Sequence, residues 1–203
     1  TTLFRSSDIL YNRSDATIDK QIKQRLKGEA CFLRAWWHFE LLKLYGGKAS
    51  NGKALGIPLA DHFFTQEEAA KHNDFVRPSY QSTVDFIVND LDSAMVLLPN
   101  AYSGDDLQFG TTQIGRATKP AAAVLKSRVL LYSASPAMQD DDVIKITGMG
   151  QFEILNPTAY QEKWKAVALE INKILGMTGF GTFVPITASA VADAQAENAD
   201  YAF

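Results

Sequence analysis

The stretch from Leu26 to Tyr45 constrains the fold most, because its residues predict a helix with two apolar faces. At about 100° per residue, the first face collects Leu26, Ala30, Leu33, Trp37, Leu41 and Leu44. Two narrow polar stripes separate it from a second face, which holds Cys31, Phe32, Ala35, Phe39 and Leu42. A surface helix needs only one apolar face. We therefore expect this helix to lie between neighbours, as in a stacked helical array.

Four segments carry helical signals with defined ends. The first is expected from about Asp15 to Tyr45, and it stops at Gly46-Gly47, where glycine suits a left-handed helix end. The other three each follow a polar capping residue: residues 79–98, 118–135 and 157–175, capped by Ser79, Thr118 and Asn156. The loops between helices are rich in Gly, Asn, Asp and Ser: residues 48–53, 100–116 and 139–150. No strand pattern is long enough to build a sheet.

The predicted fold is therefore mainly α, with antiparallel helix pairs joined by long loops. Small residues at Ala121–Ala123 would let another helix approach closely, as in tetratricopeptide hairpins. The second and fourth helices each show one apolar stripe. The stripe of the fourth helix is expected to pack inward: Tyr160, Trp164, Val167, Ala168, Ile171 and Leu175.

Composition excludes several functional classes. The 203 residues are 46% hydrophobic and 21% charged, which is enough for a real core, and the net charge of −3 offers no electrostatic basis for nucleic-acid binding. The single cysteine, Cys31, excludes an internal disulfide and a thiolate zinc site, and it is expected to be inert core. His38, His62 and His72 lack metal-ligand spacing. No catalytic motif is present, so we expect no catalytic residues, no metal and no cofactor.

The residues from Leu26 to Gly47 closely resemble the signature helix of the SusD/RagB family. They carry Glu-Ala, then Phe-Leu-Arg-Ala, then aromatic residues and Leu-Tyr-Gly in the family's order. Further segments resemble the family in the same order: Gly56–Leu59, Ser79–Pro99, Gly115–Ala123, Leu130–Tyr132, Asn156-Pro157, and Trp164 with Ala168. The residues that match the helical scaffold of the family are Glu29, Leu33, Arg34, Ala35, Trp37, Tyr45, Gly46, Trp164 and Ala168.

This resemblance implies a SusD-like fold and a non-catalytic role. Family members are lipid-anchored in the outer membrane of Gram-negative bacteria, where they bind oligosaccharides and cap a SusC-like TonB-dependent transporter. They are much longer, so residues 1–203 are expected to be a single helical region of a longer protein. That region would lack the native N-terminus, which carries the lipid anchor, and the C-terminal half. Two alternatives stay open: a tetratricopeptide-type protein-interaction scaffold, and a peptide-binding relative of the same family.

The residues expected to contact a glycan lie in one loop between helices, because a rigid scaffold commonly presents binding residues on its loops. They are Tyr102, Asp105, Asp106, Gln108 and Phe109. The large aromatics of the helices are expected to pack in the core instead.

Two groups of charged residues have alternative interpretations. Arg34, with Glu29 or Glu40, could bind a ligand, but a structural ion pair is the favoured reading. Asp140–Asp142 offers oxygen ligands for calcium, but it lacks the Asp-x-Asp-x-Asp-Gly pattern of a calcium loop.

Overall fold

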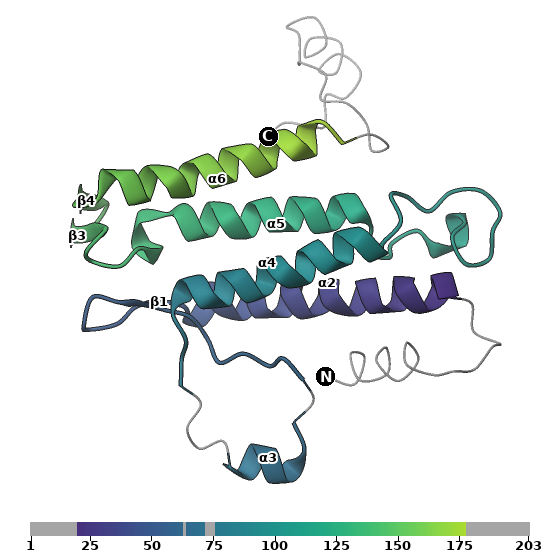
Figure 1. Ribbon diagram of the computed structural model, residues 1–203, viewed down its shortest axis with the longest axis horizontal. Coiled ribbons are helices and arrows are strands. Elements are labelled where there is room, and N and C mark those ends of the chain that lie inside the picture. The colour runs from purple at the N-terminus through teal and green to yellow at the C-terminus, as the bar shows by residue number, and fades with distance from the viewer. Residues whose placement is uncertain (1–19, 63, 72–75, 178–203) are drawn as a thin grey trace, which may run out of the picture.

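The computed structural model describes residues 20–62, 64–71 and 76–177, and these residues form a mainly α-helical structure (Figure 1). The part of the first expected helix that precedes residue 20, and His72, lie outside these ranges. The helices are α2 (Lys20–Tyr45), α3 (Gln66–Lys71), α4 (Tyr80–Leu97), α5 (Lys119–Ala134) and α6 (Pro157–Leu175).

Four long helices stack side by side in chain order, and each runs opposite to the one before it (Figure 1). α2 packs on α4, α4 on α5, and α5 on α6. The loop from α4 to α5 therefore lies at the end of the stack where α2 begins. The antiparallel helix pairs predicted from the sequence are confirmed. None of the helices that the described residues form combines the length and apolar character needed to cross a membrane.

Local sequence signals explain where the long helices start. The Ser79, Thr118 and Asn156 side chains each accept a hydrogen bond from the backbone N–H three residues later, so all three predicted caps are confirmed. At the end of α2, a Cβ on Gly46 would lie 2.5 Å from the Leu42 carbonyl oxygen, and Gly47 adopts a φ of 146°. α2 therefore ends at the position that the glycine pair predicted.

Two short antiparallel hairpins extend from the other end of the stack. β1 (Gly47–Lys48) pairs with β2 (Ala54–Leu55), and β3 (Ile144–Gly148) pairs with β4 (Gln151–Ile154). The expectation that residues 139–150 form only a loop is wrong. Strand formation depends on cross-strand partners, and each of these strands is too short to be recognised without its partner.

The core lies where the second apolar face of α2 meets α4 and α5. Its largest fully buried side chains include Phe39 and Leu42 of α2, Ile87 and Leu91 of α4, and Val129 of α5. The ring of Phe39 also meets that of Tyr132 edge-on, with a centroid distance of 5.4 Å. The apolar stripe predicted for α4 is confirmed by this packing.

Most of the first apolar face of α2 is exposed within the described residues, although Ala30 of this face is buried. Trp37 is 64% exposed and Leu44 is 74% exposed, while Leu33 and Leu41 are 37% and 43% exposed. The prediction that Trp37 lies in the core is therefore wrong for this part of the chain. α2 is the outermost helix of the described stack, so α4 and, to a smaller extent, α5 cover it from one side only.

The packing face of α6 also differs from the predicted stripe. Val167, Glu170 and Ile174 are buried, whereas Trp164 is 39% exposed and Leu175 is 57% exposed. The predicted core position of Trp164 is wrong. The buried face includes a charged residue, Glu170, which faces Lys126 of α5 at 3.4 Å. A search for apolar periodicity misses a face of this kind.

Candidate functional site

The loop from α4 to α5 folds back over the beginning of α2. Arg25 of α2 donates a hydrogen bond from Nη1 to the backbone oxygen of Gln108. Its guanidinium group also lies over the ring of Phe109, 5.4 Å from the ring centroid. At the base of the loop, the Lys119 N–H donates to the Pro99 carbonyl oxygen at 2.9 Å. These contacts hold one aromatic residue of the loop against the helix.

The loop is also ordered by its own hydrogen bonds. One carboxylate oxygen of Asp106 accepts from the backbone N–H groups of Gln108 and Phe109, both at 2.7 Å. The Ser103 N–H donates to the Phe109 carbonyl oxygen at 3.1 Å. Gly110 has no room for a side chain, because a Cβ would lie 2.2 Å from the Asp106 carbonyl oxygen. The backbone around Phe109 is therefore held without any ligand.

A cluster of charges around the buried Glu29 lies beneath the loop. Glu29 is 8% exposed and receives hydrogen bonds from Arg116 at 3.0 and 3.2 Å. Arg25 lies on the other side of Glu29, with its Nε 3.5 Å from the carboxylate. The Tyr102 hydroxyl donates toward Glu29 at 3.5 Å and toward the Ala117 carbonyl at 3.2 Å. Burial raises the pKa of Tyr102, and the charge of Glu29 raises it further, so this phenol stays neutral.

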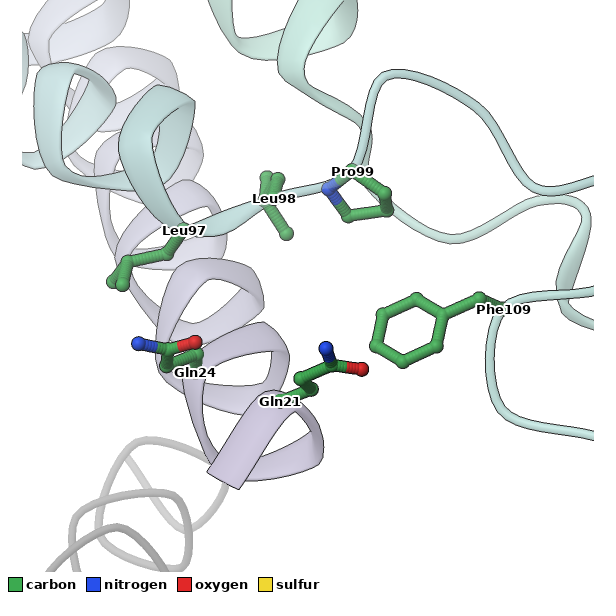
Figure 2. Close-up of a pocket in the computed structure, with 6 residues that line it drawn as sticks. All are labelled: Gln21, Gln24, Leu97, Leu98, Pro99 and Phe109. Atoms are coloured by element: carbon green, nitrogen blue, oxygen red, sulfur yellow. The ribbon is translucent and has the colours of Figure 1, made fainter. Parts of the chain in front are cut away.

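An open hollow of about 270 Å³ lies between this loop and the ends of α2 and α4. Its lining comes from three segments: Gln21, Gln24, Leu97, Leu98, Pro99 and Phe109. Figure 2 shows the Phe109 ring reaching from the loop toward the amide of Gln21, with Leu98 and Pro99 along one side. Gln24 lies one turn further along α2 (Figure 2). The hollow thus combines an aromatic ring, an apolar wall and two amide groups.

The five residues predicted for glycan contact have different positions in this loop. Phe109 lines the hollow, and Tyr102 is buried with its hydroxyl turned to Glu29. Asp105, Asp106 and Gln108 are exposed on the loop but do not line the hollow. Sequence reasoning missed the two glutamines and the end of α4. The predicted antiparallel order of the helices could have pointed to these residues, because it places the start of α2 beside the α4–α5 loop.

The charged residues of α2 form ion pairs, but Arg34 pairs with neither Glu29 nor Glu40 as the sequence suggested. Arg34 binds Asp90 of α4, with both hydrogen bonds 2.6 Å long. Glu40 pairs with Lys43 at 2.8 Å, and Glu29 pairs with the arginines already described. The prediction that these charged residues form structural ion pairs is confirmed. Two of the partners, Asp90 and Arg116, lie far from α2 in the chain.

The acidic run at the other end of the stack faces lysine side chains. Lys53 lies 3.0 Å from Asp140 and 3.2 Å from Asp142, and Lys48 lies 2.6 Å from Asp141. Among the described residues no group of three or more His, Cys, Asp or Glu side chains is arranged to hold a metal ion. The acidic run therefore ties the β1–β2 hairpin to the segment that precedes β3.

The described residues thus form a stack of antiparallel helices with an ordered loop beside an uncharged hollow. The model of one protein family, described as starch-binding and associating with the outer membrane, matches residues 8–131, more than half of the chain. The chain belongs to this SusD-like family. A comparison with curated proteins finds no match.

Several solved structures are similar to this chain. A SusD-like protein from Bacteroides fragilis NCTC 9343 is 36% identical, over 65% of this chain and 22% of its own, with a TM-score of 0.49. The protein BT4246 is 24% identical, over 86% of this chain and 27% of its own, with a TM-score of 0.61. A laminarin-binding SusD-like protein is 21% identical, over 90% of this chain and 30% of its own, with a TM-score of 0.52. The chain thus spans less than a third of each of these three proteins, and the last two show the fold alone.

Proposed function

We propose that this chain is the helical scaffold of a non-catalytic cell-surface protein that binds oligosaccharides. The observation that carries the proposal is the match of residues 8–131 to a family described as starch-binding and associating with the outer membrane. The laminarin-binding relative supports a carbohydrate ligand. The uncharged hollow beside Phe109 agrees with this ligand class, since binding sites combine apolar walls with a few polar groups.

The protein would act in nutrient uptake, delivering its glycan to a SusC-like TonB-dependent transporter while anchored by lipid in the outer membrane. The exposed part of the first apolar face of α2, with Trp37 and Leu44, supports a role for the scaffold in protein contacts as well. Residues 1–203 would then form one helical unit within a longer protein. The exposed loop residues Asp105, Asp106 and Gln108 stay candidates for glycan contact from the rim of the site.

Calorimetry with the full-length protein tests the ligand class. We expect binding to at least one uncharged oligosaccharide from a panel of α- and β-glucans, with no cleavage of the glycan during the measurement. Binding to peptides, and to no glycan, would favour the peptide-binding alternative. Copurification with an outer-membrane transporter tests the delivery step. An association with cytoplasmic proteins instead would favour the tetratricopeptide-type scaffold.

A further inference from the structure

We propose that the hollow beside Phe109 holds one uncharged sugar residue of a longer oligosaccharide. The inference rests on the proposed function, because it names the place where part of the glycan binds. Size supports a single sugar residue. The volume of about 270 Å³ lies just below the range of roughly 300–1,000 Å³ that encloses drug-sized ligands. Because the hollow is open to solvent, the rest of a glycan chain can leave it on either side.

The lining matches the two surfaces of a sugar ring. A pyranose presents C–H groups on its faces, and these pack on apolar and aromatic surfaces such as Phe109, Pro99 and Leu98. Its hydroxyl groups both donate and accept hydrogen bonds around the ring edge. The amide of Gln24 also offers both a donor and an acceptor, and this glutamine lines the hollow on the α2 side. An aromatic platform and an amide partner therefore face one space from different elements.

Charge decides the class of sugar. None of the six lining side chains carries a charge. Behind the ring, Arg25 already lies against Glu29 and donates to the Gln108 carbonyl oxygen. A carboxylate or sulfate on the ligand would lose part of its hydration in this open hollow without gaining a cation from the lining. The hollow therefore fits a neutral sugar and disfavours uronic acids and sulfated sugars.

The ring of Phe109 is positioned before a ligand arrives. Asp106 accepts from the Phe109 N–H, Ser103 donates to the Phe109 carbonyl, and Arg25 lies over the ring. A loop that is already ordered loses less conformational entropy on binding. Arg25 and Asp106 are thus positioning residues, which act on the ligand through Phe109.

Calorimetry on the full-length protein, with maltoheptaose and laminariheptaose as probes, tests the inference. Phe109→Ala removes the platform, and Gln24→Leu removes the amide at nearly constant volume. Each should weaken the affinity for the bound probe about tenfold or more, which corresponds to the loss of one aromatic or polar contact. The matched control is Leu107→Ala, since Leu107 is a 77% exposed residue of the same loop that does not line the hollow. It should bind as the parent protein does.

A second measurement separates binding from folding. Phe109→Trp should keep the affinity and place an indole in the hollow, whose fluorescence then changes when the probe is added. The same titration of Leu107→Trp should leave the spectrum unchanged. Circular dichroism checks that each variant keeps the helical content of the parent.

The outcomes distinguish this site from the general function. If the parent binds a glucan while Phe109→Ala and Gln24→Leu bind it equally well, the site is wrong and the proposed function stands. If polygalacturonate binds more tightly than either neutral probe and Phe109→Ala abolishes that binding, the assignment to uncharged sugars is overturned. If the parent binds no glycan at all, the proposed function fails, and this site fails with it.

Discussion

Arg34 of α2 binds Asp90 of α4 through two parallel hydrogen bonds, from Nε to Oδ2 and from Nη2 to Oδ1, both 2.6 Å long. The two side chains are 18% and 7% exposed, so the pair lies at the edge of the core between the two helices. The Arg34 guanidinium also lies over the ring of Phe86, 4.9 Å from the centroid, and donates to the Asp61 carbonyl oxygen. One residue thereby joins α2, α4 and the segment between them.

Arg34→Met should lower the free energy of unfolding by about 3 kcal/mol, because the substitution leaves the buried Asp90 carboxylate without its cation. Urea denaturation measures the change. The control is Lys165→Met, which breaks an ion pair with Glu162 whose side chains are both 65% exposed. That change should cost less than about 1 kcal/mol. Equal losses in the two variants would contradict the structural role assigned to Arg34.

His38 should make stability depend on pH. Its Nε2 accepts from the Ala60 N–H at 3.1 Å, and its Nδ1 therefore carries the proton that is donated to the Arg34 carbonyl oxygen at 2.8 Å. Burial is the main cause that lowers the pKa of His38 below its usual 6.5; the Arg34 charge lowers it further, and the Arg34 carbonyl and Asp90 oppose the shift.

A lowered folded-state pKa gives the sign of the pH effect. Between the folded and unfolded pKa values, the unfolded chain binds more protons. The stability that His38 contributes is therefore complete above about pH 6.5, and it is lost as pH falls toward the folded-state pKa. Urea denaturation at about pH 7.5 and about pH 5.5 should show that the free energy of unfolding falls more in the parent than in His38→Gln. A fall of the same size in both proteins would mean that other groups cause the pH dependence.

Gly28 lets the end of α4 approach α2 beside the hollow. A Cβ at this position would lie 3.0 Å from the Cβ of Leu97 and from two side-chain atoms of Leu98. Gly28→Ala should gain roughly 0.5–1 kcal/mol of helix propensity, but forcing the helices apart costs typically 1–3 kcal/mol. We expect a net loss of about 1 kcal/mol in urea denaturation. Asn89→Ala, on an exposed position of α4, is the control and should stay within about 0.5 kcal/mol. If Gly28→Ala is more stable than the parent, the side chains of Leu97 and Leu98 move aside at little cost in free energy.

The exposed face of α2 makes a prediction about hydrophobic surface. Trp37 and Leu44 are 64% and 74% exposed, so Trp37→Ser should change the stability of the 203-residue chain by less than about 1 kcal/mol. It should also reduce the binding of a hydrophobic dye. Phe39→Ser, at a fully buried position of the same helix, should instead unfold the chain or nearly so. If Trp37→Ser in the full-length protein costs several kcal/mol, other parts of that protein cover this face.

The local sequence determined the four long helices of this protein and most of their ends, but it did not predict the short helix α3 (Gln66–Lys71). Ser79, Thr118 and Asn156 supply cap oxygens to backbone groups three residues away, so their effect needs no tertiary partner. Gly46 and Gly47 likewise end α2 through local crowding and backbone conformation. The two apolar faces of α2 were also readable, because helical periodicity is a property of the chain itself.

Tertiary structure alone decided which face is covered, which charges pair and where the hollow forms. Glu29 meets Arg116, and Arg34 meets Asp90, across long separations in the chain that no periodicity encodes. Trp37 and Phe39 are only two residues apart, yet one is exposed and the other is buried, because α4 packs on just one side of α2. The hollow depends on Phe109 reaching Gln21 across the end of the stack (Figure 2). That approach follows from the packing of helices that are far apart in sequence, and no local pattern in the chain records which side chains meet there.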